Sequence, residues 1–206
     1  MHVDKTLVTG IPLDEAGKAL VMLHGRGGSA NDMLRLRESL QLDDFCIFIP
    51  QASNNAWYPY TFLSHPTINE PWLSSALQLI TGLIKEMDDH GISSEKIFFL
   101  GFSQGACLAL EYTARYARRY GGIVSFTGGL IGDKLYYNNY KGNFEKTPVF
   151  MSASARDPHV PTDRVEKTAE LFRKMNADIT LSIYNGSSHT VTKEEIDFVN
   201  CNFFNL

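Results

Sequence analysis

The sequence predicts an α/β fold in which helices cover both faces of a mostly parallel sheet. Short apolar runs of strand length alternate along the chain with longer segments of helical periodicity. The 206 residues contain no internal repeat, low-complexity tract or linker, so we expect a single domain over residues 1–206. No large insertion separates Thr127 from Pro148, and the fold should therefore lack a large cap domain.

The elements follow from the apolar patterns in chain order. The segments 5–10 and 18–23 are interpreted as a β-hairpin. Later strands are expected at 45–49, 97–100, 122–126, 149–151 and 179–184. Helices are expected at 30–40, 70–89, 104–118, 162–175 and 192–203.

The segment Gly101-Phe102-Ser103-Gln104-Gly105 lies between the apolar run 96–100 and a helical pattern. A strand-to-helix turn of this kind is where hydrolases hold a serine nucleophile. The serine there has a positive φ, so the residues two before and two after it must be small. Gly101 and Gly105 meet that need, and the pattern predicts Ser103 as a nucleophile.

A serine nucleophile needs a base and an orienting acid. Asp157 follows the apolar run 148–151 and lies in Asp-Pro-His-Val-Pro, where the prolines make the loop rigid. His189 ends a loop of small residues after the strand 179–184. Because the carboxyl ends of parallel strands share one edge of a sheet, Ser103, Asp157 and His189 are predicted to meet there.

Other residues compete for these assignments. Asp133 follows the run 121–130, where some hydrolases place their carboxylate, and is otherwise a loop or cap residue. His159 lies beside Asp157 in the sequence and is assigned to the mouth of the site. The remaining histidines are His24, which precedes a glycine-rich loop, and His2, His65 and His90, which are assigned solvated or structural positions.

The segment 20–29 runs from an apolar strand into the glycine-rich turn His-Gly-Arg-Gly-Gly. It has no Gly-Lys-Ser/Thr and no three-glycine fingerprint, which argues against a phosphate-binding loop. An early loop of this kind supplies one main-chain N–H of an oxyanion hole, and the residue after the nucleophile supplies the other. The predicted donors are Arg26 and Gln104, with the Arg26 side chain left free near the mouth.

An irregular segment at 51–69 combines aromatic residues with prolines and is too long for a tight connector. It is interpreted as an aromatic wall or short lid, and Trp57, Tyr58 and His159 are predicted to contact substrate. The alternative is a hydrophobic cluster that only packs the loop. A second irregular segment, 133–146, contains three tyrosines and is assigned equally to substrate contact and to a packed surface loop.

Four motifs occur in a fixed order. They are Leu-His-Gly-Arg-Gly-Gly at 23–28, Gly-Phe-Ser-Gln-Gly-Ala at 101–106, Asp-Pro-His-Val-Pro at 157–161 and Ser-Ser-His at 187–189. Together they resemble the phospholipase/carboxylesterase group of α/β-hydrolases, which includes bacterial carboxylesterases and acyl-protein thioesterases. The resemblance implies an α/β-hydrolase fold.

The matched positions imply roles for individual residues. In that group they act as nucleophile (Ser103), base (His189) and orienting acid (Asp157), with the main chains of Arg26 and Gln104 as oxyanion donors. Two positions depart from the group: Ser152-Ala153-Ser154 replaces a frequent His-Gly, and thioesterase relatives usually carry leucine at the position of Arg26. Both departures argue against a long-chain acyl substrate.

The resemblance implies a serine carboxylesterase acting on short- to medium-chain or aryl esters through an acyl-enzyme. Alternatives are an acyl-protein thioesterase or lysophospholipase, a small-lactone hydrolase, and a non-catalytic ligand-binding protein that keeps the hydrolase fold. The expected partner is a small-molecule ester. Relatives are sometimes dimers, so a homodimer also stays open.

Composition narrows the function classes. A net charge of −4 argues against nucleic acid or an anionic membrane as an obligate partner. The start of the chain lacks a secretion signal and no apolar run has membrane-spanning length, so a cytoplasmic location is expected. Three widely spaced cysteines, Cys46, Cys107 and Cys201, are predicted to be reduced and buried. No metal-ligand spacing occurs, and we expect neither a metal nor a cofactor.

Overall fold

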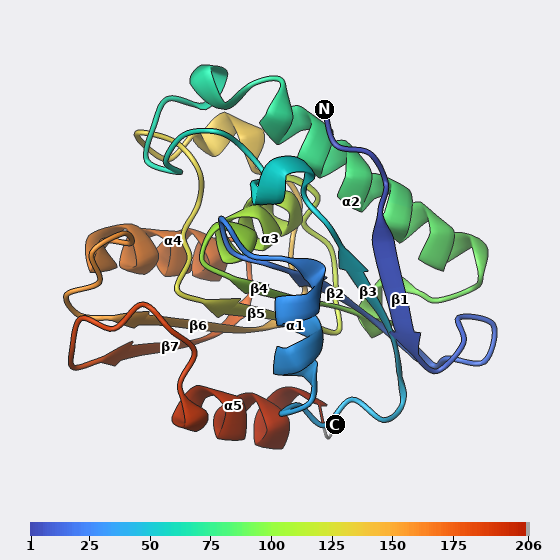
Figure 1. Cartoon of the computed structure of the whole chain (residues 1–206). Coiled ribbons are helices and arrows are strands. Elements are labelled where there is room, and N and C mark those ends of the chain that lie inside the picture. Colours follow the sequence, from blue (N-terminus) through green and yellow to red (C-terminus); the bar gives the residue numbers. More distant parts are fainter. Residues whose placement is uncertain (205–206) are drawn as a thin grey trace.

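A computed structural model describes residues 1–204, which form one sheet with strand order β1-β3-β2-β4-β5-β6-β7 (Figure 1). The strands are β1 Thr6–Gly10, β2 Lys18–Leu23, β3 Phe45–Pro50, β4 Ile97–Phe102, β5 Gly122–Phe126, β6 Pro148–Ser154 and β7 Asp178–Tyr184. The α-helices are α1 Ala30–Arg37, α2 Trp72–Asp89, α3 Gln104–Arg115, α4 Thr162–Lys174 and α5 Lys193–Val199.

The predicted hairpin between the first two strands is wrong. β1 pairs antiparallel with β3, whereas β2 lies between β3 and β4 and is parallel to both. The burial of the two strands explains this arrangement. β2 is buried from Ala19 to Leu23 and belongs inside the sheet, while β1 is only partly buried, with half of Val8 exposed, and forms an edge.

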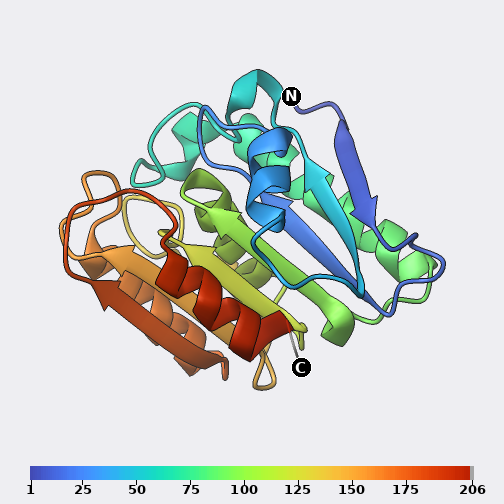
Figure 2. The same cartoon turned by 60° about the horizontal axis from the view of Figure 1, so that its bottom comes forward.

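Helices lie on both faces of the sheet, as alternating side chains of the strands require. α2, α3 and α4 share one hydrophobic cluster with strand residues such as Val21, Phe99 and Met151. α1 and α5 share the other cluster with their neighbours Met22, Leu100 and Phe150. Figure 2 shows α1 and α5 together on the face that comes forward. The α/β arrangement predicted from the sequence is therefore confirmed.

Local sequence sets the helix ends. Ser29 with Asp32 and Thr192 with Glu195 form capping boxes at the starts of α1 and α5. The helix α1 ends three residues earlier than predicted, because residues 38–40 continue with tighter i to i−3 hydrogen bonds. Phe203, at the predicted end of the last helix, lies in a π-helical turn, Asn200–Phe204, that follows α5.

The cysteines differ in their environments. Cys46 in β3 and Cys107 in α3 are buried, as predicted. Cys201 is exposed, so its predicted burial is wrong. It occupies the π-helical turn, whose buried side is formed by Asn200, Phe203 and Phe204.

Candidate active site

Ser103 sits at a sharp turn between β4 and α3. Its backbone has φ 54° and ψ −117°, a conformation that non-glycine residues rarely adopt. The turn is held from both sides, because Ser103 N–H donates to Phe126 O at 2.9 Å and Ser103 O accepts from Cys107 N–H at 2.9 Å. The side chain is thereby presented at the carboxyl edge of the sheet.

The two glycines beside this turn are required by close backbone contacts. A Cβ atom on Gly105 would lie 2.1 Å from Leu23 O in β2. A Cβ atom on Gly101 would lie 2.5 Å from the main chain of Gly105 and Ala106. Any side chain at either position would push α3 away from the sheet.

Three side chains from separate loops form one hydrogen-bonded chain. Ser103 Oγ lies 2.8 Å from His189 Nε2, and His189 Nδ1 lies 2.8 Å from Asp157 Oδ2. Because a carboxylate only accepts, the Nδ1–H donates to Asp157, and Nε2 is left to accept from the serine hydroxyl. The Asp157 side chain is fully shielded from solvent, and one fifth of the His189 side chain is exposed.

The Asp157 carboxylate is fixed by its own loop. Its Oδ1 accepts the main-chain N–H groups of His159 at 2.8 Å and Val160 at 2.9 Å. The competing acid, Asp133, is exposed and accepts the Tyr136 hydroxyl at 2.7 Å. The structure thus brings Asp157, and not Asp133, to the histidine.

A cavity of about 470 Å³ opens beside Ser103. Arg26 and Gln104 both line it, together with His159 and the segment 58–62. Gln104 is the first residue of α3, so its N–H has no acceptor within the helix. This N–H and that of Arg26 are the candidate donors to an oxyanion at Ser103.

A sequence profile described as phospholipase/carboxylesterase matches residues 6–204 of this chain. The chain belongs to the phospholipase/carboxylesterase family. Members of the family are serine hydrolases, so this chain is a hydrolase of the carboxylesterase and acyl-protein thioesterase family. The resemblance based on the four sequence motifs and the predicted α/β-hydrolase fold are both confirmed.

Individual relatives agree with the family assignment. The crystal structure of a phospholipase/carboxylesterase from Dyadobacter fermentans is 49% identical, covers 98% of this chain and 97% of that one, and superimposes with a TM-score of 0.97. Acyl-protein thioesterase 1 of Eremothecium gossypii is 28% identical over 87% of this chain and 83% of that protein. Acyl-protein thioesterase 1 of Debaryomyces hansenii is 34% identical, but the match covers only 58% of this chain and 52% of that protein.

The predicted substrate contacts of this hydrolase separate into two groups. Tyr58 and His159 line the cavity, and the His159 ring packs edge-on against His189 with 5.0 Å between the centroids. Trp57 does not line the cavity and is fully buried, so the prediction that it contacts substrate is wrong. Its indole N–H donates to His24 O at 2.8 Å, which makes it part of the support beneath the loop.

The Arg26 side chain is not free at the mouth, contrary to the prediction. Its guanidinium donates to Pro59 O at 2.6 Å and also to Tyr60 O. It also lies 5.9 Å from the centre of the Tyr58 ring. One residue therefore connects the glycine-rich turn to the aromatic wall of the cavity.

The side chains of Gln104 and His24, to which the sequence motifs assigned no function, support the backbone next to the cavity wall. The Gln104 amide accepts the Trp57 N–H at 2.9 Å and donates to Tyr58 O at 2.8 Å. Buried His24 donates through Nδ1 to Gly25 O at 2.7 Å and accepts the Ala52 N–H at Nε2, 3.1 Å away. Burial lowers the pKa of His24, which suits the neutral form that this pair of bonds requires. The sequence feature that could have revealed this role of the Gln104 side chain is a polar residue at the start of a buried helix.

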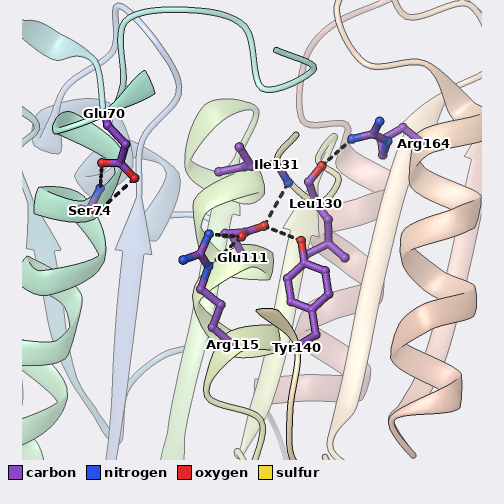
Figure 3. A network of polar contacts seen from close by, with 8 residues as sticks. All are labelled: Glu70, Ser74, Glu111, Arg115, Leu130, Ile131, Tyr140 and Arg164. Carbon is purple, nitrogen blue, oxygen red and sulfur yellow. Dashed lines mark hydrogen bonds and ion pairs between the residues drawn. The ribbon is translucent and has the colours of Figure 1, made fainter. Parts of the chain in front are cut away.

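A buried carboxylate holds the loop after β5 (Figure 3). Glu111 in α3 pairs with Arg115, with 2.7 Å between Nε and Oε1. Its other oxygen accepts the Ile131 N–H and the Tyr140 hydroxyl, both at 3.1 Å. Burial raises the pKa of Glu111, and these donors oppose that effect.

Arg164 in α4 fixes the same loop from the other side. Its guanidinium donates to Leu130 O at 2.9 Å (Figure 3). It also donates to Gly132 O at 2.5 Å. The Gly132 N–H in turn donates to Phe62 O at 2.7 Å, and Phe62 lines the cavity. Phe62 is part of the cavity wall 58–62, so this wall is hydrogen-bonded to the loop that Glu111 and Arg164 hold.

Neither a metal centre nor a membrane span stands out in the described chain. Among residues 1–204, no group of three or more His, Cys, Asp or Glu side chains is placed to hold a metal ion. No helix within the same range is both long and apolar enough to cross a bilayer.

Proposed function

We propose that the protein is a serine carboxylesterase that hydrolyses short- to medium-chain or aryl esters through Ser103, His189 and Asp157. The observation that carries the proposal is the pair of 2.8 Å contacts that link the serine at the strained turn to the histidine and the histidine to the buried carboxylate. This is the arrangement that turns a serine hydroxyl into a nucleophile at neutral pH.

The reaction runs in two halves. His189 Nε2 takes the Ser103 proton as Oγ bonds to the acyl carbon, and the N–H groups of Arg26 and Gln104 stabilise the negative oxygen. The bond to the leaving alcohol then breaks, and His189 returns the proton to that alcohol. In the second half, water gives a proton to His189 and attacks the acyl-enzyme, which releases the acid and restores the Ser103 hydroxyl. Asp157 holds the imidazole and stabilises its charged form.

The cavity favours small substrates. A volume of about 470 Å³ lies in the range that binds small organic ligands. Hydrogen bonds hold the backbone of the wall 58–62 at two places. The Arg26 guanidinium donates to Pro59 O, and the Gly132 N–H donates to Phe62 O. Both contacts hold this wall in place, and we expect them to resist the opening that a long acyl chain would need.

Hydrolysis of thioesters is the second candidate, because two relatives carry the name acyl-protein thioesterase 1. The same two half-reactions cleave a C–S bond with a thiol as the leaving group. Release of thiol from acetyl and palmitoyl thioesters, compared with the matching oxyesters, distinguishes the two activities. The exposed Cys201 contributes a background signal to a thiol reagent, so a Cys201→Ser protein is the appropriate enzyme for this assay.

The proposal is tested with p-nitrophenyl esters from acetate to palmitate, with Ser103→Ala protein as the blank. We expect the highest kcat/KM at short chains and a loss of about 10⁶-fold in kcat in the variant. A maximum at long chains would support the thioesterase or lysophospholipase alternative. Equal rates in the two proteins would exclude Ser103 as the nucleophile.

A further inference from the structure

The inner end of the cavity contains a polar group that the proposed mechanism does not use. Tyr58 lines the cavity with Cys107, and both residues are almost completely buried, at 1% exposed each. The Tyr58 hydroxyl interacts with the Cys107 thiol, which is a weak acceptor, but it meets the geometry of a hydrogen bond with no residue in the described chain. A buried hydroxyl without a partner is uncommon, because its desolvation costs about 1–3 kcal/mol.

The main chain that carries this hydroxyl is held in place beside the nucleophile. The Gln104 amide donates to Tyr58 O at 2.8 Å and accepts the N–H of the preceding residue at 2.9 Å. The Arg26 guanidinium lies 5.9 Å from the ring centre. Because Gln104 follows Ser103 directly, the main chain of Tyr58 is held at a fixed position relative to the nucleophile, and its side chain is buried from there.

The hydroxyl is at the end of the cavity that the acyl group would occupy. His189 has to protonate the leaving group, so the leaving group lies on the side bordered by His189 and the exposed His159. Cys107 lies one helical turn after Ser103, on the same side of α3. The acyl arm therefore extends from Ser103 towards Cys107 and Tyr58.

The polar side chains at this end of the cavity are uncharged. Burial raises the pKa of Tyr58, and burial raises that of Cys107 to about 12, so both groups stay protonated at neutral pH. Burying a charged substrate group here would be costly, whereas an uncharged oxygen needs only one donor. We propose that the Tyr58 hydroxyl donates a hydrogen bond to an ether, carbonyl or hydroxyl oxygen in the acyl arm of the substrate. This inference rests on the proposed esterase function and adds a preference for oxygenated acyl groups.

Three pairs of p-nitrophenyl esters test this preference, since each pair differs only in a CH₂ group replaced by an ether oxygen. The pairs are methoxyacetate with butanoate, 3-methoxypropanoate with pentanoate, and 4-methoxybutanoate with hexanoate. The measured quantity is the ratio of kcat/KM for the ether to that for its carbon analogue. Comparing this ratio between variants removes the intrinsic reactivity of each ester.

We expect Tyr58→Phe to lower the ratio about five- to tenfold for at least one pair, which corresponds to one lost hydrogen bond. The melting temperature of this variant should stay the same or rise, because the hydroxyl removed has no partner in the free enzyme. Tyr120→Phe is the matched control. Tyr120 is also fully buried but lies outside the cavity, and its hydroxyl donates to Tyr116 O at 2.8 Å. That variant should lose stability and keep the wild-type ratios.

The outcomes separate this inference from the proposed function. Hydrolysis of the esters with the same three ratios in wild type and Tyr58→Phe would overturn the role of Tyr58 and leave the esterase function in place. A fall in the melting temperature of Tyr58→Phe equal to that of Tyr120→Phe would also overturn it, because the hydroxyl would then have a structural partner. Failure of the wild type to hydrolyse any of the six esters would overturn both proposals.

Discussion

Gln104 Oε1 accepts the main-chain N–H of Trp57 at 2.9 Å, so the residue that follows the nucleophile also holds the wall of the cavity. The same amide donates to the next carbonyl along the wall, Tyr58 O. Distances within the site thus depend on a side chain whose own backbone is a candidate oxyanion donor.

Replacement of Gln104 by leucine should destabilise the protein and lower activity together. The change leaves two buried main-chain groups without partners, and each costs about 1–3 kcal/mol. Urea unfolding and kcat/KM for p-nitrophenyl butanoate measure the two effects. Gln78→Leu on the exposed side of α2 is the control, and its unfolding free energy should change by less than about 0.5 kcal/mol.

Asp157→Asn should reduce kcat by about 10⁴-fold while the fold is kept. The amide has nearly the shape of the carboxylate, but it no longer favours the tautomer in which His189 Nε2 accepts the serine proton. Asp133→Asn removes the other candidate acid and should leave kcat within twofold of wild type. A large loss in the Asp133 variant and a small one in the Asp157 variant would reverse the assignment of the acid.

Arg26→Leu should widen the range of acyl chains. The main-chain N–H remains, whereas the two hydrogen bonds to Pro59 O and Tyr60 O are lost. We expect the ratio of kcat/KM for octanoate to that for butanoate to rise about three- to fivefold, since solvent-exposed hydrogen bonds of this kind contribute about 1 kcal/mol or less. An unchanged chain-length profile would show that the guanidinium does not control the wall.

Thiol labelling should distinguish the three cysteines. Burial raises the pKa of Cys46 to about 11 and that of Cys107 to about 12, so neither forms the reactive thiolate at about pH 8. A disulfide-based thiol reagent should react with one equivalent in the native enzyme, at Cys201, and with three after unfolding. Cys201→Ser should abolish the fast reaction, and persistence of that reaction would point to opening of the core near Cys46 or Cys107.

Stability should fall on mild acidification because of His24. Burial lowers the folded-state pKa of this histidine below its unfolded value of about 6.5, so the unfolded chain binds more protons in the window between the two values. The contribution of His24 to stability is present above that window and is lost as the pH falls through the folded pKa, with a slope of up to about 1.4 kcal/mol per pH unit. Urea unfolding between about pH 5 and 8 should show a shallower slope for His24→Gln than for wild type.

Much of the sheet could be predicted because its strands are short and follow apolar or alternating patterns, and all seven predicted strands overlap observed strands. The pairing of β1 could not be predicted in this way. Apolar periodicity reports which residues are buried, but it does not identify the neighbouring strand. The choice of β3 over β2 follows from the position of β2 between β3 and β4, which only the assembled sheet reveals.

The candidate site, like the sheet, could be predicted from the sequence only in part. Ser103, Asp157 and His189 lie in motifs whose local sequence determines their turns, so the chain of contacts was predictable. Trp57 and Tyr58 are adjacent aromatic residues with the same local surroundings, yet only Tyr58 lines the cavity. Their separation depends on contacts with His24 and Gln104, which are distant in the sequence.

The helix α3 presents Ser103, Cys107 and Glu111 at intervals of four residues, starting from its N-cap. The nucleophile, the cavity-lining Cys107 and the carboxylate that holds the loop after β5 therefore move as one rigid body. A change in the tilt of this helix alters the positions of all three together. The segment 59–61 has the opposite property, because the Arg26 side chain holds its backbone and its own side chains are exposed to solvent. Directed evolution of new substrate ranges should accordingly yield more active variants from libraries in 59–61 than from libraries of equal size in α3.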